Sequence, residues 1–178
     1  MVPMGMANAF LIKADDGLTL IDAGYPDKEG AVFATIREIG YSPDQLQHLI
    51  FTHGHPDHLG SGAAIVRETG ARTYMHTIDI PIAESGGPFR PLEPAPGLLR
   101  RVLCNLLFHP DKRVEPVPID EPLTGGEILP IAGGIEVIHT PGTARDRWRC
   151  CGTLDGCCSR AMCVRTLWAL VIHLASRV

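Results

Sequence analysis

Several features that would place this chain in a specialised class are absent from it. There is no run rich in lysine or arginine, and 20 acidic against 16 basic residues give a formal net charge of −4. Residues 1–9 lack a basic segment followed by a long apolar core, and no stretch approaches the roughly 20 apolar residues that span a bilayer. These absences argue against a nucleic-acid-binding surface, a secretion signal and a membrane segment. We therefore expect a cytoplasmic protein that acts on a small molecule; nothing in the sequence indicates an oligomeric state.

Cysteine is scarce outside one short segment. Of the six cysteines in the chain, five lie close together near the carboxyl end: Cys150, Cys151, Cys157, Cys158 and Cys163. Without a secretion signal a disulfide framework is not expected, and the spacing lacks the paired C-x-x-C units of a zinc ribbon. The cysteine cluster therefore needs another explanation.

The composition is that of an ordinary globular domain. The chain has 178 residues, of which 45% are hydrophobic and 20% charged. That length is sufficient for one domain with a substantial hydrophobic core.

Hydrophobic periodicity and turn residues predict alternating strands and helices. In the first half we expect a hairpin of strands 8–13 and 18–22, a helix over 28–39, a helical turn after Ser42, a strand at 48–51, a helix over 59–68 and a strand at 72–76. In the second half we expect a loop at 85–97, an apolar helix over 98–108, strands at 117–119 and 127–131, and a Gly-Gly turn into a strand at 135–139. The alternation predicts an α/β layered fold.

One stretch, from Thr52 to Gly62, concentrates chemically active side chains. His53, His55, Asp57 and His58 fall within six residues, directly after the apolar run 49–51. In extended backbone, residues two apart point the same way, so the first two histidines can converge on one cation. The turn at the intervening proline then allows the aspartate and the third histidine to face a second position.

Imidazole and carboxylate ligands favour zinc, with iron or manganese as alternatives. Asp57 is also the candidate catalytic residue, because a carboxylate beside a metal-bound water can orient it or carry its proton. The competing interpretation is a polar surface loop in which the histidines occur by chance.

The motif His-x-His-x-Asp-His, together with Leu-Ile-Asp-Ala-Gly at residues 20–24, resembles the metallo-β-lactamase superfamily over residues 6–142. That superfamily includes glyoxalase-II-like thioesterases, lactonases and β-lactamases. The resemblance implies a four-layer αββα sandwich in which Asp22 is a buried residue beside the metals. The alternative for Asp22 is an aspartate that caps its own turn.

His139 stands at a predicted strand end before Thr140-Pro141-Gly142, as the third histidine ligand does in the family. The resemblance then implies that His53, His55 and His139 hold the first metal, and that Asp57 and His58 hold or help to hold the second. A metal-bound hydroxide would attack a thioester, a lactone or another ester or amide carbonyl.

The resemblance ends after residue 142. The family continues with a Gly-Asp pair, whose aspartate bridges the metals, and a last histidine, whereas residues 143–151 read Thr-Ala-Arg-Asp-Arg-Trp-Arg-Cys-Cys. We therefore divide the chain into the amino-terminal part of a metallo-β-lactamase-like domain, residues 1–142, and an atypical Cys/Arg-rich tail, residues 143–178. The carboxyl-terminal half of the fold is expected to be incomplete, with an exposed sheet edge and low stability.

We hypothesise that the tail is read in a shifted frame. A shift of one base turns the second residue of each Cys-Cys pair into leucine, and suitable wobble bases give a strand, a turn and a Gly-Asp pair. The competing interpretation is a divergent tail in which residues 167–175 form a terminal helix or strand. Sequencing the gene tests the hypothesis, because early stop codons in the shifted frame would contradict it.

The expected function is that of a zinc-dependent hydrolase. Two alternatives stand beside it. One is a non-catalytic fragment that binds a single metal weakly, since the bridging aspartate and the last histidine are missing. The other is a nuclease of the same superfamily, which the acidic charge balance disfavours.

Overall fold

The computed structural model of the protein describes residues 1–4, 7–89, 113–139 and 162–166. The predicted helix over 98–108 and most of the tail lie outside the described residues. So does the second part of the loop predicted at 85–97.

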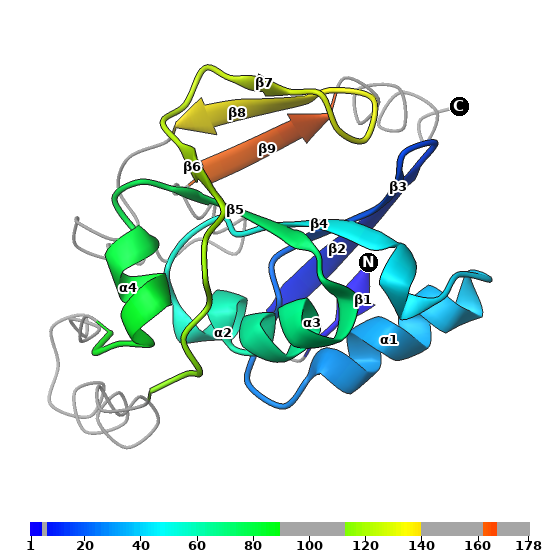
Figure 1. Ribbon diagram of the computed structural model, residues 1–178, viewed down its shortest axis with the longest axis horizontal. Coiled ribbons are helices and arrows are strands. Elements are labelled where there is room, and N and C mark those ends of the chain that lie inside the picture. The colour runs from blue at the N-terminus through cyan, green and yellow to red at the C-terminus, as the bar shows by residue number, and fades with distance from the viewer. Residues whose placement is uncertain (5–6, 90–112, 140–161, 167–178) are drawn as a thin grey trace, which may run out of the picture.

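A mixed six-stranded sheet forms the centre of the molecule (Figure 1). Its strands, in spatial order, are β1 (Val2–Pro3), β2 (Asn8–Ala14), β3 (Gly17–Ile21), β4 (Leu46–Ile50), β5 (Arg72–His76) and β6 (Glu121–Leu123). The first three strands are antiparallel, and β3 to β6 are parallel. The predicted hairpin is confirmed: Ala14 pairs with Gly17, whose φ of 114° suits a residue without a Cβ.

Helices cover one face of this sheet (Figure 1). They are α1 (Glu29–Glu38), the 3₁₀ turn η1 (Pro43–Gln45), α2 (Pro56–Leu59), α3 (Gly62–Thr69) and α4 (Ile80–Ser85). The predicted helix over 28–39 is confirmed as α1, which buries Val32 and Ile36, two residues one turn apart. The helical turn expected after Ser42 is confirmed as η1, which this residue starts with a capping box.

The helix predicted over 59–68 is confirmed as α3, but it begins three residues later, because the chain breaks between α2 and α3. A Cβ on Gly60 would lie 2.2 Å from the backbone nitrogen of Pro26, so this residue is wedged against another loop. Ser61 Oγ donates to Tyr25 O at 2.6 Å and accepts from Lys28 N at 2.8 Å. These tertiary contacts hold the break, and helix periodicity carries no sign of them.

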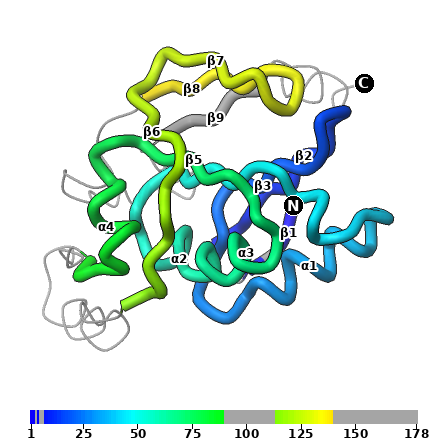
Figure 2. Tube along the Cα trace, in the orientation of Figure 1, coloured from blue at the N-terminus to red at the C-terminus, as the bar shows by residue number. Residues whose placement is uncertain are grey.

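A second, three-stranded antiparallel sheet lies on the other side, away from α1, α2 and α3 (Figure 2). It comprises β7 (Ile128–Leu129), β8 (Ile135–His139) and β9 (Met162–Thr166), with β8 in the middle. The turn at Gly133 and Gly134 and the strand after it are confirmed, although β7 is shorter than the predicted strand at 127–131.

The strand predicted at 117–119 is wrong. Pro116 and Pro118 have no N–H to donate to a ladder. Thr73 of β5 instead holds this region by two hydrogen bonds. Its Oγ1 donates to Pro118 O at 2.7 Å, and its backbone N–H donates to Asp120 Oδ2 at 2.8 Å.

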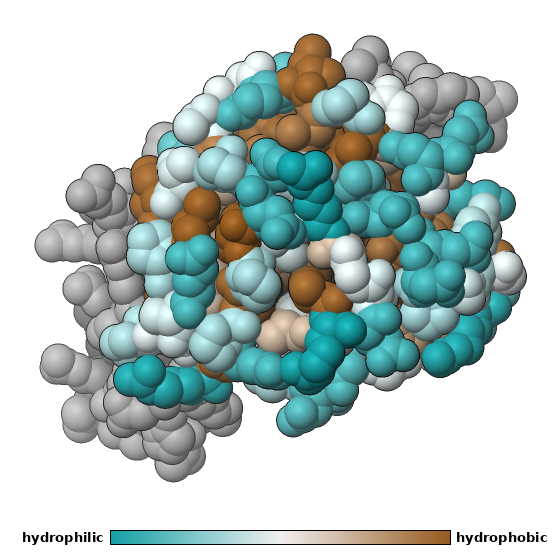
Figure 3. All heavy atoms as spheres, in the orientation of Figure 1, coloured by the Kyte–Doolittle hydropathy of each residue, from teal (hydrophilic) through white to brown (hydrophobic). Residues whose placement is uncertain are grey.

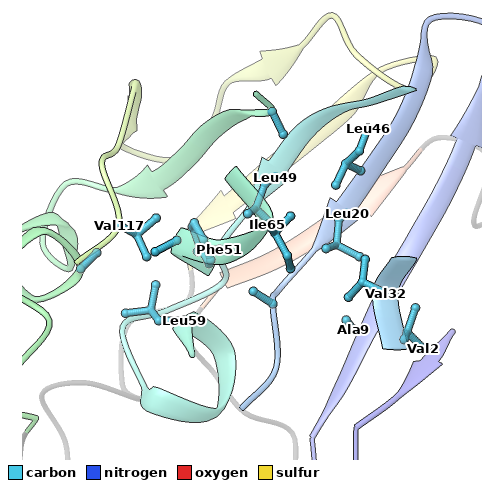
Figure 4. Close-up of a cluster of buried hydrophobic side chains, with 14 of the residues drawn as sticks. Val2, Ala9, Leu20, Val32, Leu46, Leu49, Phe51, Leu59, Ile65 and Val117 are labelled. Carbon is cyan, nitrogen blue, oxygen red and sulfur yellow. The ribbon is translucent and has the colours of Figure 1, made fainter. Parts of the chain in front are cut away.

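The central sheet is buried on both faces, as its parallel strands require. Leu20 and Leu49 pack in a cluster with α1 and α3, whereas the next residues along, Ile21 and Ile50, pack against the second sheet. Figure 4 shows the first cluster, in which Phe51 lies between Leu49 and Leu59. The described residues thus form three layers, one of helices and two of sheet, and the predicted α/β class is confirmed.

The face drawn in Figure 3 is a mosaic of hydrophilic and hydrophobic side chains. The large apolar side chains that remain exposed come from separate elements, for example Phe10 of β2 and Ile128 of β7. Among the described residues, no helix is long and apolar enough to cross a membrane.

Candidate functional site

The candidate site lies where the parallel strands β3, β4 and β5 end. Asp22 follows β3, Thr52 follows β4 by two residues, and His76 ends β5. Backbone bonds extend the ladder past the strands, with Asp22 N donating to Ile50 O and Phe51 N to Tyr74 O, both at 2.9 Å. The carboxyl edge of parallel strands is where open α/β sheets bind their ligands.

Three histidines of the motif lie together at this edge. The ring centroids of His53 and His55 are 4.6 Å apart, and those of His53 and His58 are 4.0 Å apart. Pro56 stands at the first position of α2, where its fixed φ starts the helix, and the N–H of His58 donates to His55 O at 3.0 Å. The proline turn therefore brings the ring of His58 back beside that of His53.

Asp22 is buried and forms hydrogen bonds with residues of the motif. Its carboxylate accepts bonds from the Thr52 N–H at 2.8 Å, from the Thr52 hydroxyl at 2.8 Å and from His58 Nδ1 at 2.8 Å. These partners are 30 and 36 residues away in the sequence, so the carboxylate does not cap its own turn.

The hydroxyl of Thr52 links Asp22 to His53. It has one proton, which the carboxylate accepts, so its oxygen is the acceptor for His53 Nδ1 at 3.0 Å. This assignment leaves Nε2 of His53 with its lone pair free for a cation. His58, tied to Asp22 through Nδ1, presents Nε2 in the same way when it is neutral. Such partners on the far ring nitrogen are typical of metal-binding histidines.

Burial and mutual repulsion keep two of the rings neutral. Burial, followed by the charges of His58 and His55, lowers the pKa of His53 to about 2. Burial is also the main reason that the pKa of His55 is lowered. Burial acts the same way on His58, but its hydrogen bond to Asp22 and the charges of Asp22 and Asp57 outweigh it and raise the pKa. Neutral imidazole is the form that binds metal.

Asp57 contacts the motif through His58, whereas the ring contact of His139 is with His76. Asp57 Oδ2 is 3.5 Å from His58 Nε2, and the Asp57 side chain is 34% exposed. His139 ends β8, where its ring packs edge-on against His76 with centroids 4.2 Å apart. A Cβ added to Gly125 would lie 2.6 Å from the Cβ of His139, so the backbone of Gly125 packs closely against this histidine.

The donors fit a divalent transition metal in kind, in burial and in the way that their other ring nitrogens are held. They do not close around one point: among the residues that the structure describes, no three or more His, Cys, Asp or Glu side chains are grouped so that they could hold one ion. A bound ion would have to draw them together.

Three residues of this edge were not identified from the sequence: Thr52, His76 and Asp79. Thr52 had no signal beyond its place at the start of the motif. His76 was interpreted as a strand-end residue, and its contact with His139 depends on how the two sheets meet. Asp79 had a signal, because an aspartate before Ile-Pro and seven residues before Gly86 marks the start of a short helix, here α4.

Comparison with known proteins identifies the family. The family model described as the metallo-beta-lactamase superfamily matches residues 2–158. An uncharacterized protein of Bacillus subtilis, YobT, is 28% identical over 141 residues, which cover 76% of this chain and 52% of that protein. YflN of the same organism, described as a probable metallo-hydrolase, is 28% identical over 92 residues, covering 50% of this chain and 35% of that protein.

Among solved structures, BJP-1, a subclass B3 metallo-beta-lactamase of Bradyrhizobium japonicum, is similar with a TM-score of 0.62 and 25% identity, covering 76% of this chain and 46% of that one. The chain thus spans about half the length, or less, of the relatives that it matches. The paired sheets, the histidine motif at the sheet edge and the family match over most of the sequence together show that this chain belongs to the metallo-beta-lactamase superfamily.

Proposed function

We propose that the chain is a zinc-dependent hydrolase that acts on a thioester, a lactone or another ester or amide carbonyl. The observation that carries this proposal is the hydrogen-bonded unit of Asp22, Thr52, His53 and His58 at the carboxyl edge of the parallel strands. It fixes two imidazoles with their Nε2 atoms available, and membership of a superfamily of metal-dependent hydrolases agrees with that use.

In this proposal His53, His55 and His139 hold the first ion, and Asp57 and His58 hold or help to hold a second. The donor set suits zinc, with iron or manganese as alternatives. A bound zinc ion supplies Lewis acidity, which lowers the pKa of water and polarises a carbonyl.

The chain's own residues orient and move protons. Asp22 keeps Nδ1 of His58 protonated and thereby fixes which nitrogen faces the site. Thr52 does the same for His53. Asp57, whose side chain is 34% exposed beside His58, would accept the proton of the attacking water and pass it to the leaving group.

The proposed substrate class is based on the net charge of the chain and on its membership of a superfamily of hydrolases. The net charge of −4 favours a small molecule over a nucleic acid. The loops around the site, rather than the fold, determine which substrate is bound.

The test is turnover by zinc-loaded protein of a thioester, a lactone and a cephalosporin, with chelated protein as the blank. We expect zinc-dependent hydrolysis of at least one of them, and a fall in kcat of about 10²- to 10⁴-fold in Asp57→Asn, as for loss of a general base. Asp44→Asn, which changes an exposed aspartate far from the motif, is the matched control and should retain full activity.

A second candidate is a non-catalytic chain that binds one metal weakly. The dispersed donors favour it, since no three of them are grouped among the described residues. Bound zinc without turnover of any substrate would support this candidate, and cleavage of RNA or DNA would instead support a nuclease.

A further inference from the structure

We infer that Asp79 is a positioning residue for the histidine motif: its carboxylate fixes the peptide group between His53 and His55. Asp79 caps α4 and lies outside the motif, whereas its partner Gly54 lies within it. The inference rests on the proposed metal-binding function for its consequence, although not for its geometry.

The contact is a hydrogen bond across 25 residues of sequence. The backbone N–H of Gly54 donates to Asp79 Oδ2 at 3.2 Å. The peptide that joins His53 to Gly54 is planar, so the direction of this N–H sets the plane of the whole group. Restraint of that plane limits ψ of His53 and φ of Gly54, and thereby the path of the backbone from His53 towards His55.

Steric contact reinforces the bond. A Cβ on Gly54 would lie 2.4 Å from Ile82 Cγ2 and 3.4 Å from the Cβ of Asp79. The turn between the two histidines is therefore seated directly on the first turn of α4, which only glycine allows.

Asp79 is itself held on both sides. Its N–H donates to His76 O at 2.9 Å, and its carbonyl accepts from the N–H groups of Ile82 at 3.1 Å and Ala83 at 3.2 Å. Ala83 is fully buried. The backbone of Asp79 is thus tied to the end of β5 and to the core, and the carboxylate that it carries transmits that position to the motif.

Loss of the contact should act on metal affinity. A bond from a backbone N–H to a carboxylate is stronger than a neutral one, and removal of a partner outside the ligands lowers metal affinity by about 10- to 100-fold. Asparagine at position 79 keeps an oxygen that can accept the same bond, whereas alanine does not.

The first experiment measures the affinity of the protein for zinc ions alone, by competition with a chromophoric chelator. We expect Asp79→Ala to bind zinc at least about 10-fold more weakly than wild type, and Asp79→Asn to stay within about 3-fold. Glu84→Ala, which removes an exposed carboxylate from the same helix, is the control and should match wild type. Equal affinity in wild type and Asp79→Ala would overturn the inference, as would an equal loss in Glu84→Ala.

The second experiment needs no metal and separates this inference from the proposed function. In chelated protein we expect the amide hydrogen of Gly54 to exchange about 10-fold faster in Asp79→Ala than in wild type or Glu84→Ala, as loss of a bond of about 1.4 kcal/mol predicts. Unchanged exchange would overturn the inference. If wild-type protein binds no zinc while Asp79→Ala still shows the faster exchange, the proposed function alone is overturned.

Discussion

At the scale of single residues, Asp22 combines an unusual backbone with a buried charge. Its φ is 61°, a left-handed conformation that aspartate and asparagine tolerate better than most residues. From that position the carboxylate reaches both Thr52 and His58. Asparagine would keep the conformation and the size of the side chain while removing the charge, which makes it the informative substitution.

We therefore predict that Asp22→Asn lowers the pKa of His58. The hydrogen bond and the charge of Asp22 are what raise this pKa against the effect of burial, and both weaken in the variant. An NMR titration of the imidazole in metal-free protein measures the change, with Asp44→Asn as the control. A His58 pKa that is unchanged in Asp22→Asn would contradict this role of the carboxylate.

The buried neutral state of His53 predicts how stability depends on pH. Its pKa is about 2 in the folded protein against 6.5 as the ordinary value, so below about pH 6.5 the unfolded chain binds a proton that the folded protein does not. The free energy of unfolding should therefore fall as the pH drops, by up to about 1.4 kcal/mol per pH unit from this group.

His58 does not oppose this effect in that range. Its pKa is raised, so its contribution is fully present below about pH 6.5 and is lost as the pH rises through the folded value. Urea unfolding of metal-free protein at pH 6.5 and pH 5 measures the loss, which should be smaller in His53→Gln, since glutamine does not titrate. The same loss in both proteins would show that His53 is not buried in the neutral form.

At the scale of elements, the break between α2 and α3 sets the position of the motif relative to the loop before α1. Ala23 N donates to His58 O at 2.8 Å, and Gly60 packs against Tyr25 and Pro26. The end of α2 and the loop after β3 are therefore bound to each other, and these two segments carry His58 and Asp22.

We predict that Gly60→Ala destabilises the protein by about 1–3 kcal/mol, the usual cost of overpacking, because the added Cβ meets backbone atoms that cannot move aside. The matched control is Gly30→Ala in α1, where a Cβ meets nothing within 4 Å. That change should stabilise by about 0.5–1 kcal/mol, since alanine is the better helix former. Urea unfolding compares the two variants, and equal effects in both would contradict the packing described for Gly60.

The sequence predicted the elements that depend on local signals. The hairpin around Gly17, α1 before Gly40, and β5 all follow from turn residues and periodicity. The sequence did not predict the features that depend on tertiary contacts. The break at Gly60 depends on the loop at Pro26. The segment at 117–119 does not form a strand, and the carbonyl of Pro118 instead accepts a hydrogen bond from the Thr73 hydroxyl.

For the site, the sequence placed His53, His55 and His58 together because they lie in one short motif. It predicted a buried Asp22 only through the family resemblance. It gave no role to Asp79, which lies 25 residues from Gly54, because only the packing of α4 on the motif brings the two residues together. Residues that lie close in sequence were predictable, and partners brought in by packing were not.

At the scale of the whole molecule, the described residues form the helical layer and the two sheets, with the motif at the carboxyl end of β4. β9 lies in the tail, and its antiparallel pairing with β8 extends the second sheet. The rest of the tail lies outside the described residues, so the shifted reading frame stays a prediction that sequencing of the gene would test.

Metal binding should also stabilise the whole chain. An ion that binds only the folded protein raises the free energy of unfolding by about 2.7 kcal/mol when its concentration is 100 times the Kd. The motif joins the ends of β3 and β4 to α2, so the ion would act on the elements that hold the core together.

The most direct measurement is the zinc content of the protein by mass spectrometry, after loading with zinc and removal of free ions by gel filtration. We predict about one zinc ion or more per chain for wild type, and none for the double variant His53→Ala and His55→Ala. His48→Gln is the matched control: it changes a histidine that bonds the Tyr74 hydroxyl at 3.0 Å, and it should retain the wild-type zinc content. Wild-type protein without zinc, or a double variant that retains as much zinc as wild type, would contradict the assignment of the histidine motif as a metal centre.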